Sequence, residues 1–390
     1  MSMMEHRIFA DVGFSSLNKA GEELCGDKVH ITRTPDSAVI VLADGLGSGV
    51  KANILATLTS KIAGDMLRMG SDIEDVVDTL TQTLPVCKVR GVAYSTFTIF
   101  QVFADGRAYL VEYDNPSTFF FRQGKLEELY YLERTVNGKM IKESRFRVTE
   151  EDTVVLISDG AVHAGVGQIL NLGWQWSHIA EHLGKIVPET ASTRAVARQL
   201  AEACEALYCG KPGDDTTAVA VRFRMASPVT LLVGPPSNPE LDSRIVREWF
   251  TRPGKKVVCG GTSATIASRE LGEELEVDWS SASDPDIPPA GKLAGVDLVT
   301  EGVLTLRKVL EYLQAYKAGG TLDRKSHGAS RLARLLLREA TEIHFIVGTA
   351  INPAHQNPNF PQDLNIKLRI VNDMIRTLRE LDKPTSITLY

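Results

Sequence analysis

The sequence has few cysteines, and none of the five lies in a Cys-x-x-Cys pair. Scattered cysteines of odd number argue against a disulfide framework or a zinc site and are typical of a reducing compartment. No apolar run approaches the roughly 20 residues of a membrane-spanning helix. The N-terminal segment MSMMEHRIFADVG also lacks the apolar core of a signal peptide. We therefore expect a cytoplasmic protein that does not bind membranes.

An excess of positive charge is also missing. Lys and Arg number 43 against 49 Asp and Glu, which gives a net charge of -6. The chain therefore has no electrostatic basis for binding nucleic acid or an anionic membrane surface. With 43% hydrophobic and 24% charged residues, the composition predicts a folded globular protein.

A chain of 390 residues exceeds one ordinary hydrophobic core, so we expect two domains. The pattern changes at Met225–Pro228, and we place the domains at residues 1–226 and 229–390. In the second domain short strand and helix patterns alternate. This alternation predicts an α/β, doubly wound, Rossmann-like fold with a mostly parallel sheet.

The stretch SAVIVLADGLGSGVKA, residues 37–52, places a carboxylate at the end of a strand. Ser37–Ala43 is rich in Val and Ile and predicts a buried strand. It ends at Asp44-Gly45, and a helical pattern follows over Lys51–Met69. Oxygen donors on a rigid strand suit hard cations such as Mg2+ or Mn2+. Taken alone, however, an Asp-Gly pair after a strand is more often an ordinary turn.

Three further acidic spots lie at the ends of apolar strand patterns. They are Asp27, Asp159 and the pair Asp214-Asp215. No nucleophile or base motif accompanies them. Carboxylates gathered in one place repel each other unless a cation neutralises them. Together with Asp44, these spots favour a paired-metal carboxylate site.

The order of these motifs matches a known family. Gly26-Asp27 comes first, followed by ADGLGSG (43–49), LISDG (156–160) and GDDTT (213–217). In this order they resemble the PP2C-type metal-dependent protein phosphatases, most closely the bacterial SpoIIE, RsbU and RsbX branch, over residues 6–224. The resemblance implies an α+β fold, an αββα sandwich of two sheets flanked by helices.

The resemblance also implies a role for each acidic residue. Asp44 would touch two Mn2+ or Mg2+ ions and hold a metal-bridging water. Asp27 and the Gly45 carbonyl would complete the first ion. The other ligands would be Asp159 and Asp214 at the second ion, with Asp215 in the next position. The bridging water would attack the phosphorus of a phosphoserine or phosphothreonine in line.

Two segments depart from the commoner family pattern. The loop Leu46–Gly49 lacks the His of many relatives and is nearer the RsbX type. After the second Asp-Gly, Ala161–Gly165 replaces the Thr-Glu-Ala that is common in relatives. His163 in this segment is a candidate acid for the leaving oxygen. The alternative is that this histidine is structural or merely exposed.

The second domain resembles no family that we identify. Doubly wound sheets bind ligands at the carboxyl ends of their strands. There Gly260-Gly261-Thr262-Ser263, at a helix start, could hold a small ligand or an anion through backbone amides. The segment is neither a Gly-x-Gly-x-x-Gly motif nor a P-loop. Alternatively, its glycines only close a tight turn.

These observations favour a metal-dependent serine/threonine protein phosphatase in bacterial partner-switching or stress signalling. The resemblance implies a phosphorylated protein substrate, such as a STAS-type antagonist or a stressosome protein. Two alternatives stay open. One is a ligand-sensing signalling scaffold with conditional phosphatase activity, and the other is a phosphoesterase acting on small molecules.

Overall fold

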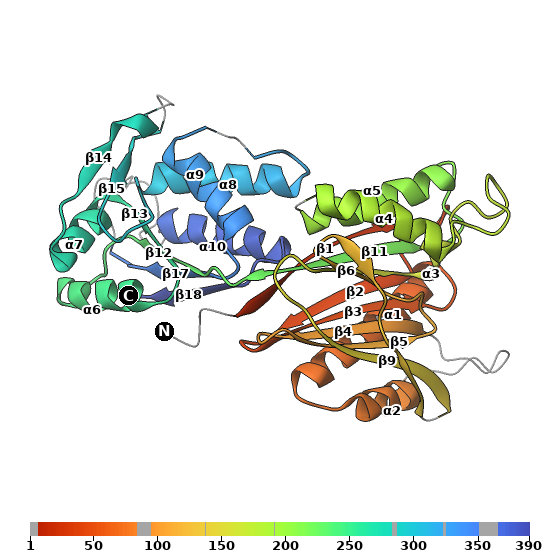
Figure 1. Cartoon of the computed structure of the whole chain (residues 1–390). Coiled ribbons are helices and arrows are strands. Elements are labelled where there is room, and N and C mark those ends of the chain that lie inside the picture. The colour runs from red at the N-terminus through yellow and green to blue at the C-terminus, as the bar shows by residue number, and fades with distance from the viewer. Residues whose placement is uncertain are drawn as a thin grey trace. The chain divides into compact units, whose positions relative to one another are not determined.

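The computed structural model describes residues 7–83, 95–136, 138–190, 192–282, 287–322, 325–350 and 366–390. The chain divides into two compact units, Met1–Met225 and Ala226–Tyr390 (Figure 1). Among the described helices, none is long and apolar enough to cross a membrane.

The first unit contains two antiparallel sheets. One has the strand order β2-β3-β4-β5-β9-β8 and the other the order β1-β11-β10-β6-β7. The strands of the first sheet are β2 (Asp27–Arg33), β3 (Ser37–Gly45), β4 (Ser95–Phe103), β5 (Arg107–Tyr113), β8 (Leu132–Val136) and β9 (Lys139–Arg147). Those of the second are β1 (Ile8–Leu17), β6 (Phe119–Arg122), β7 (Lys125–Glu127), β10 (Thr153–Ile157) and β11 (Thr216–Met225).

Helices cover the outer face of each sheet, so the first unit is an αββα sandwich (Figure 1). Side chains of α1 and α2 share a core with the six-stranded sheet, and those of α4 and α5 share one with the five-stranded sheet. A third core lies between the sheets. The helices are α1 (Gly49–Arg68), α2 (Ile73–Thr83), the short α3 (Asp159–Val162), α4 (Trp176–Glu189) and α5 (Thr193–Leu207).

The middle residues of the central strands β3 and β10 are apolar because both faces of these strands are covered. On β3, Val39 and Val41 pack towards the helices, whereas Ile40 and Leu42 face the opposite sheet. On β10 the same alternation repeats with Val155 and Ile157 outward and Val154 and Leu156 inward. A strand buried on both faces reads as a continuous hydrophobic run. The two strands end near the same edge of the sandwich, which positions the acidic residues that follow them.

The second unit is built on one seven-stranded sheet of order β14-β15-β16-β13-β12-β17-β18. Five neighbouring strands, from β16 to β18, run parallel, and β14 and β15 are antiparallel at one edge. The strands are β12 (Val229–Val233), β13 (Lys255–Cys259), β14 (Glu276–Asp278), β15 (Ala290–Lys292), β16 (Leu298–Thr300), β17 (Ile343–Val347) and β18 (Thr385–Leu389). The predicted α/β class with a mostly parallel sheet is confirmed.

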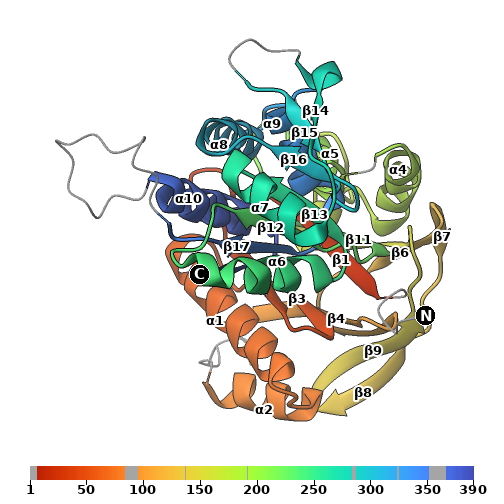
Figure 2. The ribbon, with the colours of Figure 1, turned by 90° about the vertical axis from the view of Figure 1, so that its left-hand side faces the viewer.

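Helices lie on both faces of this sheet, as in a doubly wound fold (Figure 2). Helices α8, α9 and α10 share a core with one face, and α6 and α7 share a core with the other. Their bounds are α6 (Asp242–Thr251), α7 (Gly261–Leu271), α8 (Val303–Lys317), α9 (Gly328–Arg334) and α10 (Ile366–Glu380). The order of the parallel strands reverses beside β12, so loops at their carboxyl ends are the expected place for a ligand.

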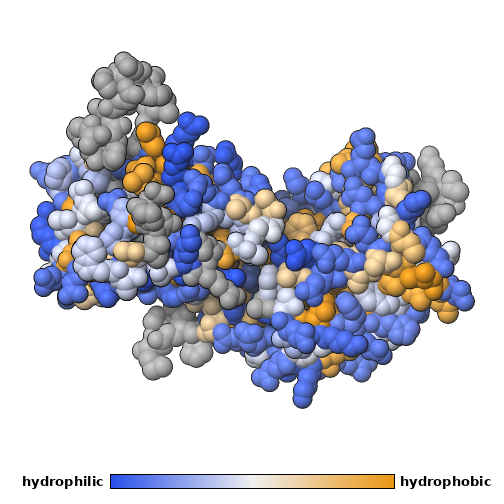
Figure 3. All heavy atoms as spheres, turned by 90° about the horizontal axis from the view of Figure 1, so that it is seen from above, coloured by the Kyte–Doolittle hydropathy of each residue, from blue (hydrophilic) through white to orange (hydrophobic). Residues whose placement is uncertain are grey.

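The face of the molecule drawn in Figure 3 is mostly hydrophilic. On the face shown in Figure 3, hydrophobic side chains form separate groups within a hydrophilic surround. Exposed large hydrophobic side chains also occur between α3 and the first residue of α4: Val166, Ile169, Leu172 and Trp176.

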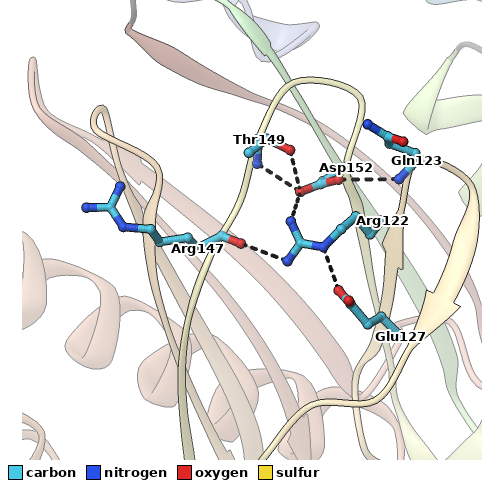
Figure 4. Close-up of polar contacts among 6 residues, drawn as sticks. All are labelled: Arg122, Gln123, Glu127, Arg147, Thr149 and Asp152. Atoms are coloured by element: carbon cyan, nitrogen blue, oxygen red, sulfur yellow. Dashed lines mark hydrogen bonds and ion pairs between the residues drawn. The ribbon is translucent and has the colours of Figure 1, made fainter.

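A buried carboxylate anchors the turn between β9 and β10 (Figure 4). Asp152 is fully buried. Its carboxylate accepts hydrogen bonds from the Thr149 amide (2.8 Å), the Thr149 hydroxyl (3.0 Å) and the Gln123 amide (3.3 Å). Arg122 lies 3.4 Å away and also pairs with the exposed Glu127. The carboxylate thus ties the β6–β7 hairpin to the turn that starts β10.

Replacing this carboxylate should destabilise the first unit. Because Asp152→Ala leaves two backbone amides and a hydroxyl without their acceptor, we expect its free energy of unfolding to fall by about 2–4 kcal/mol. Urea denaturation followed by circular dichroism measures the loss. Glu127→Gln is the matched control, since an exposed ion pair contributes at most about 1 kcal/mol. Equal effects of the two substitutions would contradict the role given to Asp152.

Candidate metal centre

Strand pairing brings two of the acidic residues face to face. Asp27, the first residue of β2, lies opposite Asp44 near the end of β3. The segment before Asp27 is held in place from two sides. The Gly45 amide donates to the Gly26 carbonyl (3.1 Å), and the Asn53 side chain on α1 donates to the Cys25 carbonyl (2.7 Å). The β2–β3 register and the start of α1 therefore fix the two carboxylates together.

Two glycines allow the backbone to approach closely at this edge. A Cβ on Gly45 would lie 2.1 Å from the Ala52 carbonyl oxygen, so only glycine fits between β3 and α1. A Cβ on Gly26 would lie 2.7 Å from Oδ2 of Asp215. Gly26 therefore makes room for a carboxylate that arrives from the other sheet.

The five-stranded sheet supplies the remaining carboxylates. Asp159 begins α3 just after β10, and Asp214 and Asp215 precede β11. Ser158 connects the two sheets: its hydroxyl donates to Oδ2 of Asp27 (2.7 Å) and accepts from the Thr217 amide (2.8 Å). The acidic residues predicted from the sequence are thus collected from both sheets at one edge of the sandwich.

Burial and neighbouring carboxylates raise the pKa values of three of these groups. Burial raises the pKa of Asp44 to about 9, and the charges of Asp27, Asp159 and Asp214 add to the rise. Burial likewise raises the pKa of Asp27 to about 7, against the hydrogen bond from Ser158. The pKa of Asp159 is also raised, by burial and then by Asp214. Negative charge at this edge is therefore unfavourable without a compensating cation.

The donor set fits a hard divalent cation. Oδ1 of Asp27 and Oδ2 of Asp215 are buried and have no hydrogen-bond partner. Buried charged oxygens without partners are costly, and Mg2+ or Mn2+ prefers such oxygen ligands. Within the described ranges, however, no three His, Cys, Asp or Glu side chains are grouped so that they could hold a metal ion as they stand. Binding would therefore require these carboxylates to reorient.

The neighbouring residues Asp214 and Asp215 have different surroundings. The Asp215 carboxylate is buried and accepts from the Lys19 amide (3.0 Å). The Asp214 side chain is 40% exposed and lies 3.7 Å from the Lys19 ammonium group. Lys19, in the loop between β1 and β2, thus brings a positive charge to the cluster. Sequence reasoning did not identify it, because no motif surrounds it and only the fold brings it to Asp214.

His163 lies at the exposed C-terminal end of α3. Its backbone amide donates to the carbonyl of Asp159 (3.1 Å), and its side-chain charge counteracts the rise in the pKa of Asp159. The histidine is therefore beside the cluster and open to solvent.

In the second unit, the predicted segment Gly260–Ser263 forms the N-terminal cap and first turn of α7, directly after β13. The carboxylate cluster described above is made of residues between 27 and 215, which belong to the first unit.

The carboxylate cluster should make stability depend on pH. Because the pKa of Asp44 is about 9 in the folded chain and about 4 when unfolded, the folded state binds more protons between these values. The free energy of unfolding of the metal-free chain should therefore fall as the pH rises from about 4 towards 9. Melting temperatures in EDTA at pH 5.5 and 8 measure this effect.

Asp44→Asn should flatten that pH dependence, and saturating Mg2+ should reduce it in the unmutated chain. Asp36→Asn, an exposed residue at the far end of the β2–β3 pair, is the control and should leave it unchanged. An identical pH dependence in the Asp44→Asn and unmutated chains would show that the carboxylates are not electrostatically coupled.

Comparisons with known proteins give a family match over the first unit. Residues 34–224 match the model of the family described as Stage II sporulation protein E (SpoIIE). No curated protein matches the chain.

Several solved structures are similar to part of the chain. The phosphatase domain of the cell fate determinant SpoIIE from Bacillus subtilis is 18% identical, with a TM-score of 0.44, and the match covers 57% of this chain and 96% of that one. The RsbU and RsbW domains of a Mycobacterium tuberculosis protein are 16% identical, with a TM-score of 0.45, and the match covers 64% of this chain and 70% of that one. RsbX in complex with magnesium is 18% identical, with a TM-score of 0.42, covering 55% and 96%.

Proposed function

We propose that the chain is a metal-dependent serine/threonine protein phosphatase. The match of residues 34–224 to the SpoIIE family model supports this proposal. It would hydrolyse phosphoserine or phosphothreonine. The observation that carries the proposal is the collection of buried carboxylates from both sheets at one edge, with two of their oxygens unpartnered. Bound cations would relieve the repulsion within such a cluster, and cations are what phosphoryl transfer requires.

Two Mn2+ or Mg2+ ions are the proposed cofactors. Their ligands would be Asp27, Asp44, the Gly45 carbonyl, Asp159, Asp214 and Asp215. When bound, the ions supply an activated water and positive charge for the phosphoryl oxygens. Asp44 is the central ligand because its pKa responds to Asp27, Asp159 and Asp214 together.

Other side chains of this unit would assist. Ser158 orients Asp27 through its hydrogen bond and so acts as a positioning residue. The Lys19 ammonium group would pair with the phosphoryl group, since it is already held beside Asp214. His163, exposed next to Asp159, would donate a proton to the leaving serine or threonine oxygen.

The proposed substrate is a phosphorylated protein in signalling, with a STAS-type antagonist or a stressosome protein as the specific candidates. The exposed apolar side chains after α3, from Val166 to Trp176, lie on the segment that follows Asp159 and His163. Exposed apolar groups on a segment that follows two residues of the proposed site suit a protein substrate better than a small phosphate ester.

A second candidate is a sensor whose phosphatase activity depends on a ligand. The observation that favours it is the separate α/β unit, in which Gly260–Ser263 starts α7 at the carboxyl end of β13. A small ligand or an anion at this segment would make the second unit regulatory. Activity that rises only when such a ligand is added would support this candidate over a constitutive phosphatase.

The principal test is metal-dependent hydrolysis. The unmutated chain should release phosphate from a phosphoserine peptide and from p-nitrophenyl phosphate with Mn2+, and lose this activity in EDTA. Asp44→Asn should lower the rate at least about 100-fold, because it removes the proposed central ligand. Asp36→Asn should retain full activity. A chain that is folded but inactive on both substrates with Mn2+ would contradict the enzyme proposal, and faster hydrolysis of sugar phosphates than of peptides would favour the phosphoesterase alternative.

Lys19 provides a separate test of substrate binding. Lys19→Ala should lower kcat/KM on the phosphopeptide by about 10- to 100-fold, the value of one charge-assisted contact to phosphate. The affinity for Mn2+, measured by calorimetry, should change little. Lys28→Ala is the control, because Lys28 is exposed and follows Asp27 directly in the sequence. Equal kinetics of the two variants would remove Lys19 from the proposed site.

A further inference from the structure

Two helices of the second unit begin side by side. Helix α7 follows β13, helix α8 follows β16, and these strands are parallel neighbours. Their N-terminal caps are Gly260 and Gly302. A Cβ on Gly302 would lie 3.5 Å from the Cα of Gly260, so the two backbones are in contact. The positive ends of two helix dipoles therefore meet at one place.

The first turn of α7 has amide donors without acceptors. Gly260 has no side chain that could cap the helix, and the first turn holds no acidic residue. In the part of the chain that the structure describes, the amides of Gly261, Thr262 and Ser263 donate to no acceptor. Gly261 and Thr262 are exposed. Such donors are available to an anionic oxygen.

A buried hydroxyl is directed at the same point. Ser263 is 1% exposed, and its Oγ has no hydrogen-bond partner. A carbon placed on Gly260 in the Cβ position would meet this Oγ at 3.5 Å and nothing nearer, so the space beside the hydroxyl is open. An unpartnered buried hydroxyl costs about 1–3 kcal/mol. A ligand oxygen at Gly260 would supply the missing partner.

Helix α8 repeats this arrangement. Thr305 occupies the third position of α8, as Ser263 does in α7, and is likewise buried with an unpartnered Oγ1. Gly302 also offers no capping side chain. Two neighbouring helices with the same unpartnered hydroxyl are better explained by a shared ligand than by two separate packing defects.

A carboxylate lies between the two helix starts. One oxygen of Glu301 accepts from the Gly302 amide (2.6 Å), and the other lies 3.8 Å from the Cβ position of Gly261. Glu301 is exposed. Its negative charge opposes a bare anion, but a carboxylate accepts hydrogen bonds from sugar hydroxyls, as the acidic residue of dinucleotide-binding folds does.

We propose that the starts of α7 and α8 bind a phosphate monoester that also carries free hydroxyl groups. The phosphate would take the amides of Gly261–Ser263 and the Ser263 hydroxyl, and the hydroxyl groups would donate to Glu301. This inference rests on the ligand site proposed for the second unit and names its ligand class. A ribose phosphate has both groups, and it occurs either as a free sugar phosphate or as part of a nucleotide.

Calorimetric titration of the full chain tests the proposal. The Asp44→Asn variant is used, so that binding is measured without hydrolysis and independently of the phosphatase proposal. Ribose 5-phosphate should bind at least tenfold more tightly than inorganic phosphate, and ribose should not bind detectably. Tighter binding of AMP than of ribose 5-phosphate identifies a nucleotide, and equal binding identifies a sugar phosphate. Absence of binding by both would overturn the proposal, whatever the phosphatase activity of the unmutated chain.

Substitutions separate a ligand role from a structural one. Ser263→Ala in the same background should weaken binding about tenfold while leaving the melting temperature unchanged or raised, because the hydroxyl has no partner to lose. Glu301→Gln should tighten the binding of inorganic phosphate and remove the preference for ribose 5-phosphate. Thr251→Ala, which removes an exposed hydroxyl on α6, is the control and should change neither the binding nor the melting temperature. A lower melting temperature with unchanged binding in Ser263→Ala would assign that hydroxyl to packing and contradict the proposal.

Discussion

Repulsion among buried carboxylates is the physical constraint on which the first unit depends. The antiparallel register places Asp27 against Asp44, and the second sheet adds Asp159, Asp214 and Asp215 to the same edge. Burial, together with neighbouring carboxylates, raises the pKa of Asp44, Asp27 and Asp159. A fold that keeps such an arrangement pays for it in stability, and a bound cation is the simplest compensation.

The surrounding residues hold the carboxylates close together, with Asp27 and Asp215 buried. Gly26 and Gly45 let α1 and Asp215 approach the backbone at distances that no side chain would permit. Ser158 satisfies one oxygen of Asp27 and leaves the other unpartnered. Asp152 shows the contrast, since its carboxylate is buried with amide and hydroxyl donors and serves only to join strands. Burial alone therefore does not distinguish a site carboxylate from a structural one.

Much of this architecture can be predicted from the sequence. Residues 38–43 and 154–157 are all apolar because helices and the facing sheet cover both sides, and the acidic residues after them mark the strand ends. Lys19 could not be predicted, because only the meeting of the β1–β2 loop with Asp214 gives it a role. The same holds for Ser158 and for Thr305, whose significance depends on which donors the fold leaves without partners.

The most direct test of the account is anomalous diffraction from crystals of the chain soaked in Mn2+. The account predicts anomalous peaks within ligand distance of the Asp44 carboxylate, with further contacts to Asp27 on one side and Asp159 on the other. The same crystals of Asp44→Asn should lose these peaks. A well-ordered edge between the two sheets with no peak near Asp44 at millimolar Mn2+ would contradict the central claim that these carboxylates form a metal centre.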